Sequence, residues 1–203
     1  MIKELNKTEM EQIYKEHMVY DFPKEELKPT ALIEKLMDEG WYRVFGYFQE
    51  EKLAAYAFLV CESPVTEHKT EEFAEKIYLL DYFAVCRTGR GQGTGSSFLN
   101  ELYEVLHPEI LIFEVEDPEI SKDQGEKEIR IRRMDFYHKN QVKDTGLSTR
   151  QFGVDLKILY WSDRWSEDAA EEKIFTALDG IYSHVFGEKY EKGEVAFTAH
   201  GKF

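Results

Sequence analysis

The chain has 203 residues, 42% of them hydrophobic and 14% aromatic, so it is long enough for one folded domain with a sizeable core and too apolar for a disordered chain. Its formal net charge of −14 argues against nucleic acid and anionic membranes as partners, because both attract clustered Lys and Arg; the charge suits a cationic amine substrate or solubility equally. Two cysteines and six scattered histidines indicate neither a disulfide framework nor a zinc site, so we expect no metal.

The polar N-terminus and the longest apolar run bear on the compartment in which the protein is expected. The N-terminus is polar and acidic, whereas a signal peptide begins with a basic segment followed by an apolar one. The longest apolar run, Leu53 to Cys61, is too short to span a bilayer. We therefore expect a cytoplasmic protein in a reducing environment, without a membrane partner.

The first 61 residues predict a strand, two helices and a hairpin. In chain order these are a strand at Ile2 to Asn6, a helix opened by the capping-box pattern Thr8 to Glu11, a helix at Thr30 to Glu39, and paired strands at Trp41 to Gln49 and Lys52 to Cys61. His17 lies on the apolar face of the first helix, where a packed core histidine is a better interpretation than a catalytic one.

The segment Val85 to Leu99 combines four glycines with two arginines. It follows a nearly all-apolar strand, Ile77 to Val85, and precedes a helical pattern from Gly95 to Leu106. A glycine-rich turn that opens a helix directs unpaired N–H groups and the positive end of the helix dipole at one spot. We interpret the segment as a phosphate site rather than a simple connecting turn.

The spacing of these glycines separates the known phosphate-binding patterns. A P-loop needs a lysine, and none occurs between Lys76 and Lys122. The dinucleotide pattern G-x-G-x-x-G fails in both registers. Started at Gly89 it requires glycine where Thr94 stands, and started at Gly91 it requires glycine or alanine where Ser96 stands. The pattern R-x-x-G-x-G fits at Arg90 to Gly95.

The C-terminal half predicts alternating strands and helices. They are a strand at Ile110 to Val115, a helix at Gln124 to Asn140, a polar stretch at Gln141 to Gln151 that has room for a short strand, a strand at Val154 to Trp161, and a last helix that begins at Ser166. In the 124–140 helix the periodicity puts one set of residues on a broad apolar side: Ile129, Arg130, Ile131, Arg133, Met134, Phe136 and Tyr137. Its arginines either pair with surface acids or bind a ligand.

The Arg90 to Gly95 pattern, with the strand before it, resembles the signature of the GNAT superfamily of acyl-CoA-dependent N-acyltransferases. Arg133 to Tyr137 resembles the second ligand-binding motif of that superfamily. Arg87 departs from it, since many members have proline there, and so do Arg130, Gln141 and Val142. The resemblance covers about Ile2 to Trp161.

The resemblance implies acetyl-CoA as donor and specific residues that hold it. The donor-binding residues would be Phe83, Ala84 and Val85 for the pantetheine arm, Arg90, Gly91, Gln92, Gly93, Thr94, Gly95 and Ser96 for the pyrophosphate, and Arg133. The thioester would lie at the split between the strands that end near Val85 and Val115. Tyr137 would protonate the departing thiolate.

Deprotonation of an amine acceptor needs a base, and three acids are candidates. Asp81 ranks first because an acid inside an otherwise apolar strand needs a reason, and Glu114 and Glu116 end the next strand. Each is also explained as an ordinary exposed acid at a strand end.

These inferences give one expected architecture. We expect a single α+β domain over residues 1–203, with a mixed, mostly antiparallel central sheet between helices, a core at about 2–161 and a helical extension at about 162–203. The extension would cap the sheet, shape the acceptor pocket or mediate a homodimer. The expected function is acetyl transfer to a small cationic amine; the alternatives are transfer to a protein or peptide amine, a non-catalytic acetyl-CoA-binding module and, more distantly, a nucleotide-binding module.

Overall fold

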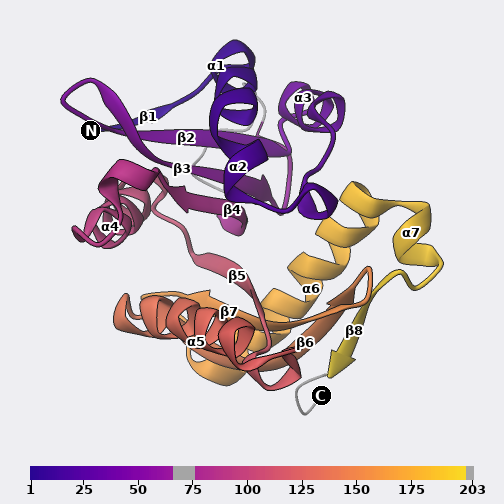
Figure 1. Ribbon diagram of the computed structural model, residues 1–203. Coiled ribbons are helices and arrows are strands. Elements are labelled where there is room, and N and C mark those ends of the chain that lie inside the picture. The colour runs from indigo at the N-terminus through magenta and orange to yellow at the C-terminus, as the bar shows by residue number, and fades with distance from the viewer. Residues whose placement is uncertain (66–75, 200–203) are drawn as a thin grey trace. The chain divides into compact units, whose positions relative to one another are not determined.

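The computed structural model describes residues 1–65 and 76–199, which form strands and flanking helices in two compact units (Figure 1). The first unit consists of Met1–Ala74 and Leu80–His107, and the second of Glu75–Leu79 and Pro108–Phe203. Strand β4 (Ile77–Val85) thus begins in the second unit and continues in the first. No helix in the described ranges is long and apolar enough to cross a membrane.

The first unit has the strand order β1-β2-β3-β4, with β1 and β2 and then β2 and β3 paired antiparallel. Besides β4, its elements are β1 (Ile2–Glu4), α1 (Lys7–Ile13), the π-helix η1 (Tyr14–Met18), α2 (Val19–Asp21), η2 (Lys24–Glu26), α3 (Thr30–Asp38), β2 (Tyr42–Gln49), β3 (Lys52–Cys61), η3 (Arg87–Gly89) and α4 (Thr94–Leu106). The predicted strand Ile77 to Val85 is confirmed at both ends.

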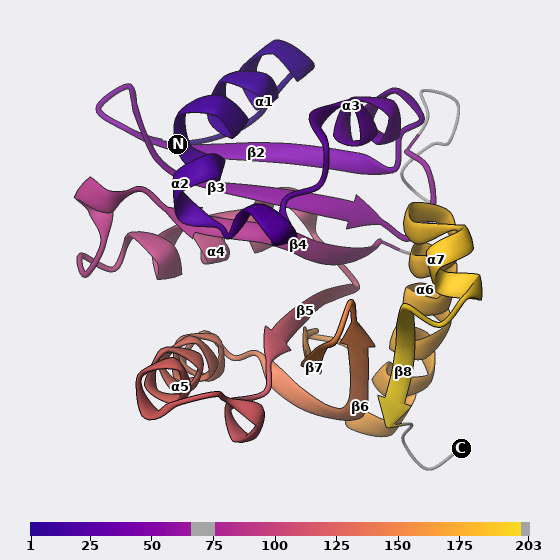
Figure 2. The ribbon, with the colours of Figure 1, turned by 45° about the vertical axis from the view of Figure 1, so that its right-hand side comes forward.

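Consecutive residues of β4 show which helices cover which face of this sheet. The Tyr82 ring lies 5.1 Å from that of Phe22, just after α2, and the Phe83 ring stacks 5.3 Å from that of Phe98 in α4. Neighbouring side chains of a strand point to opposite faces. The α1–α3 segment therefore covers one face and α4 the other, as Figures 1 and 2 show.

The N-terminal helix differs from its prediction at both ends. It is capped by Asn6 instead of Thr8: the Asn6 side chain accepts from the N–H of Glu9, and the Glu9 carboxylate accepts from the N–H of Asn6. At its other end the helix widens into η1, which a 3.6-residue periodicity cannot reveal. His17 in η1 is half-buried, in line with a packing role.

The second unit has the strand order β5-β7-β6-β8, and its neighbouring strands pair antiparallel. The elements are β5 (Ile110–Glu116), η4 (Pro118–Ile120), α5 (Gln124–Lys139), β6 (Lys143–Gln151), β7 (Val154–Trp161), α6 (Glu167–Phe186), α7 (Glu188–Glu191) and β8 (Val195–Ala199). Strand β7 is confirmed as predicted. The sequence reasoning missed α7 and β8.

Strand β5 carries helices on both of its faces. The Phe113 ring lies 4.9 Å from the Tyr137 ring of α5, whereas the next side chain, Glu114, accepts a hydrogen bond from Tyr182 of α6. Alternation along the strand therefore places α5 and α6 on opposite faces. Helix α6 buries a stripe of apolar residues at helical spacing, Ala170, Ile174, Leu178, Ile181 and Val185.

The broad apolar side predicted for α5 is partly wrong. Ile129 and Ile131 are exposed, while Arg130 is buried. The reason is that Arg130 finds polar partners that compensate for its burial, which a count of apolar residues does not register. The expected fold class, α+β with a mixed sheet flanked by helices, is confirmed.

Candidate active site

The glycine loop has the backbone that an anion site needs. Gly91 and Gly93 both have φ of +79°, a left-handed conformation that favours glycine, and a Cβ added to either would meet nothing within 4 Å. Gly93 is the N-cap of α4 and supplies no side-chain hydrogen bond, although its carbonyl accepts from the N–H of Ser97. The first N–H groups of α4 are thus available to a ligand beside an open stretch of backbone.

Arg90 is held beside this loop by two hydrogen bonds. Its Nε donates to the carbonyl oxygen of Val85 at 3.0 Å, and its Nη2 donates to Oδ1 of Asp21 at 2.8 Å. The Arg90 side chain remains 55% exposed. A cation thus lies at the start of the glycine loop with part of its guanidinium open to solvent.

The strand and helix that flank the loop are packed on their neighbours. Phe83 is half-buried against α4, and Ala84 is buried. Cys86, which follows the strand, donates its N–H to the carbonyl of Ala54 in β3 at 2.8 Å. The remaining donor-binding candidates differ in exposure: Gln92 is exposed, Ser96 is half-buried, and Thr94 and Gly95 are buried.

Tyr137 lies inside the second unit with its ring packed on Phe113 and Phe136. Burial raises the pKa of its hydroxyl to about 12, although the positive charge of Arg133 acts in the opposite direction. The phenol therefore keeps its proton at neutral pH and is chemically able to act as an acid.

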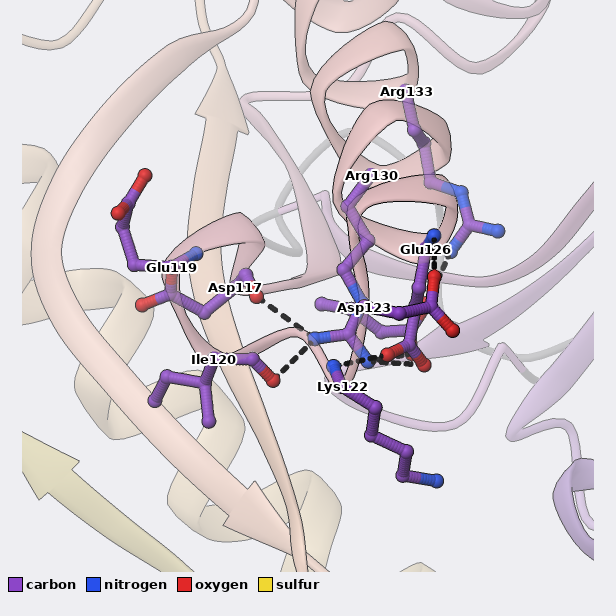
Figure 3. A network of polar contacts seen from close by, with 9 residues as sticks. Asp117, Glu119, Ile120, Lys122, Asp123, Glu126, Arg130 and Arg133 are labelled. Atoms are coloured by element: carbon purple, nitrogen blue, oxygen red, sulfur yellow. Dashed lines mark hydrogen bonds and ion pairs between the residues drawn. The ribbon is translucent and has the colours of Figure 1, made fainter.

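Arg133 and Arg130 both donate to Glu116 at the end of β5. Figure 3 shows the two arginines on α5, with Asp117, Ile120 and Glu126 around the Arg130 guanidinium. Arg133 donates through Nη1 to Glu116 Oε2 at 3.1 Å, and its side chain is half-exposed. Arg130 donates through Nη2 to Glu116 and Glu126, and through Nη1 to the carbonyls of Asp117 and Ile120 at 2.9 Å each. Both arginines pair with acids, Arg133 at the surface and Arg130 in a buried position.

Of the candidate bases, Asp81 has both carboxylate oxygens engaged. Oδ1 accepts from Lys28 Nζ at 2.7 Å, and Oδ2 accepts from the Tyr42 hydroxyl. All three side chains are largely buried, and burial followed by the charge of Asp81 raises the pKa of Tyr42 well above its usual value. These two hydrogen bonds occupy only part of the acceptor capacity of the carboxylate.

Glu114 accepts hydrogen bonds from two neutral groups. Its Oε1 accepts one hydrogen bond from Nε2 of Gln151 at 2.5 Å and another from the hydroxyl of Tyr182. Tyr182 is fully buried in α6, and burial followed by the Glu114 charge raises its pKa well above the ordinary value, so it remains a hydrogen-bond donor. The C-terminal helix therefore reaches one of the candidate bases.

The predicted site residues divide between the two units. The glycine loop and Asp81 belong to the first unit, and Glu114, Glu116, Arg133 and Tyr137 belong to the second. Within the second unit Tyr137 and Glu114 are associated with opposite faces of β5. Among the described residues no cluster of three or more His, Cys, Asp and Glu could hold a metal ion.

Comparison with known proteins shows the same fold in acetyltransferases. The chain is 28% identical over 185 residues to a Bacillus subtilis (strain 168) protein named "Putative acetyltransferase YjbC", with 84% of each chain covered. It superposes with a TM-score of 0.68 on a Bacteroides thetaiotaomicron structure titled as an acetyltransferase from the GNAT family, at 17% identity, covering 92% of this chain and 98% of that one. The chain has the GNAT fold.

Another structure with a similar fold has a named acceptor. It is a mutant of the spermidine N-acetyltransferase SpeG from Vibrio cholerae, with a TM-score of 0.53 and 12% identity over 79% of this chain and 92% of that one. No protein-family model matches the chain. Together the similarities show a fold shared with acetyltransferases and specify no acceptor.

The sequence reasoning missed several residues that contact the predicted site, Asp21 and Tyr182 among them. Asp21 and Tyr182 lie 69 and 68 residues from their partners Arg90 and Glu114, and each looks like an ordinary residue of its own segment. The only signal in the sequence was indirect, because an acid within the apolar strand β5 requires a compensating donor from somewhere in the fold.

Proposed function

We propose that the protein transfers the acetyl group of acetyl-CoA to a primary amine. The observation that carries this proposal is the Arg90 to Gly95 loop, in which two left-handed glycines, an uncapped helix N-terminus and a fixed arginine surround open space. These groups suit a pyrophosphate, which takes backbone N–H donors and a guanidinium together. The similarity to GNAT-type acetyltransferases supports the same donor.

The donor would be held along the strand and loop already described. N–H groups at the start of α4 and the Arg90 guanidinium would bind the pyrophosphate, and the backbone of Phe83, Ala84 and Val85 would pair with the pantetheine arm. A backbone N–H near Val85 would stabilise the oxyanion. Arg133, which is half-exposed while it pairs with Glu116, would add positive charge from α5.

The chemistry needs one base and one acid. The ammonium of the acceptor gives its proton to a carboxylate, the free amine attacks the thioester carbon, a C–N bond forms and the C–S bond breaks. Tyr137 donates its phenolic proton to the departing thiolate, and the second proton that the attacking nitrogen loses as the amide forms restores the phenol, directly or through water. Because its pKa is about 12, Tyr137 holds this proton throughout the neutral range.

Glu116 is paired through both oxygens with Arg130 and Arg133. Asp81 and Glu114 are the other two candidates for the base, and paired substitutions distinguish them. Asp81→Asn and Glu114→Gln both keep the shape of the side chain and remove its basicity. We expect the substitution at the true base to lower kcat/KM by at least about 100-fold, with the largest loss below the pKa of the amine, where the acceptor must be deprotonated. If one of these variants loses the same fraction of kcat/KM at every pH, the residue substituted in it has a structural role.

The acceptor favoured by this proposal is a small cationic amine. The net charge of −14 attracts cations, and one protein of similar fold is named a spermidine N-acetyltransferase. A panel of polyamines, aminoglycosides, amino acids and peptides, assayed for thiol release from acetyl-CoA, tests the choice. If peptides are the only amines that raise thiol release above background, the acceptor is a protein amine. If no amine raises thiol release although the protein binds acetyl-CoA, the protein is a non-catalytic binding module.

A further inference from the structure

Asp21, at the end of α2, places a buried carboxylate against the glycine loop. Its side chain is 7% exposed. Oδ2 accepts from the hydroxyl of Tyr56 at 3.0 Å, and Oδ1 accepts from Nη2 of Arg90 at 2.8 Å. All three residues belong to the first unit, and their contacts join α2, β3 and the loop.

Arg90 uses only part of its hydrogen-bonding capacity in this arrangement. A guanidinium carries five N–H donors in a rigid planar fork. Val85 and Asp21 fix its orientation at Nε and Nη2, and more than half of the side chain stays exposed. The remaining edge is therefore presented to solvent in a defined direction, next to the open backbone of Gly91 and Gly93.

Asp21 cannot readily release Arg90 to a ligand. Separation of the pair would leave a buried carboxylate with the neutral Tyr56 hydroxyl as its partner in this arrangement, and uncompensated buried charges are strongly disfavoured. Tyr56 is fully buried, and burial and the Asp21 charge both raise its pKa, so it stays a proton donor. The ion pair is thus expected to persist when an anion binds.

We propose that Asp21 is a positioning residue for the donor: it fixes the Arg90 guanidinium so that its exposed edge binds the pyrophosphate of coenzyme A without reorienting. The inference rests on the proposed function, because it presumes that the loop binds coenzyme A. It adds a residue outside the loop on which the affinity for the donor depends. Pre-organisation of the arginine lowers the cost of ordering a long, mobile side chain on binding.

A double-mutant cycle tests whether Asp21 acts through Arg90. Coenzyme A binding is measured by calorimetry for the wild type, Asp21→Asn, Arg90→Gln and the double variant. We expect each single substitution to weaken binding at least about tenfold, and the double variant to bind no more weakly than Arg90→Gln. Asp38→Asn is the matched control, since Asp38 is an exposed acid that pairs with Lys7 in the same unit; its binding should equal that of the wild type.

A truncated donor separates positioning from a merely structural role. S-Acetylpantetheine lacks the pyrophosphate, so Asp21→Asn should lower kcat/KM for acetyl-CoA about tenfold through KM and leave kcat/KM for S-acetylpantetheine unchanged. Tyr56→Phe, which removes only one hydrogen bond from Asp21, should show a smaller effect of the same kind and serves if Asp21→Asn does not fold.

The outcomes distinguish this inference from the function on which it rests. Failure of the wild type to bind coenzyme A overturns the proposed function. Normal binding by the wild type together with equal or tighter binding by Asp21→Asn overturns the role of Asp21 alone. Fully additive effects in the double variant, or equal losses with both donors, also overturn it.

Discussion

At the scale of single residues, Tyr137 is the side chain whose environment bears most directly on the chemistry. It is packed between aromatic rings, and burial raises its pKa to about 12. The neutral phenol is the form that burial stabilises, so the proton is lost only as the pH rises toward 12. In the proposed reaction it is an acid at every pH at which the enzyme would be assayed.

Substitution of Tyr137 by phenylalanine removes the proton and keeps the ring. We expect kcat to fall about 100-fold, with KM for acetyl-CoA little altered, because only the leaving thiolate uses the hydroxyl. Steady-state thiol release measures both constants. Tyr190→Phe, which removes a hydroxyl bonded to Asp179 at the protein surface, should leave kcat unchanged; an unchanged kcat for Tyr137→Phe would exclude it as the acid.

At the scale of elements, the sequence predicted strands best where apolar residues dominate. Strands β4 and β7 begin and end where expected, because β4 is a nearly continuous apolar run and β7 alternates apolar with polar residues. Asn6 as the cap of α1, the π-helix η1 and strand β8 were not predicted, since each depends on contacts or on a local change of helical pitch that the residue pattern does not specify. The same limit explains why the loop was found and Asp21 was not.

The junction of β5, η4 and α5 depends on Arg130. The side chain is 8% exposed and bonds two carboxylates and two carbonyls from different parts of this junction. Removal of the cation leaves Glu116 and Glu126 partly buried without this partner.

We expect Arg130→Met to lower the free energy of unfolding by about 3 kcal/mol, the cost typical of breaking a buried ion pair. Arg132→Met is a matched control in the same helix, because Arg132 is exposed, and it should change stability by less than about 0.5 kcal/mol. Urea denaturation of both variants measures the difference. Equal stabilities of the two would show that the Arg130 contacts contribute little.

At the scale of the whole molecule, the chain divides into two units that each carry part of the proposed machinery. The donor loop lies in the first, and the candidate acid in the second. The expected single-domain organisation and the homodimer stay predictions. Local patterns predicted the elements and the resemblance to GNAT proteins, and the resemblance implied the fold class. The identity of the acceptor depends on the shape of a whole pocket, which no local pattern encodes.

Whether the glycine loop binds the donor is tested by calorimetry of acetyl-CoA binding to the wild type and to Gly93→Glu. At Gly93 a side chain would be strained by the positive φ, and a carboxylate would place negative charge beside the phosphate site. Gly153→Ala is the control for strain alone, since Gly153 also has a positive φ and open space but lies in the β6–β7 turn. We predict binding by the wild type and Gly153→Ala and none by folded Gly93→Glu; absence of binding by the wild type, or equal binding by Gly93→Glu, would contradict the account.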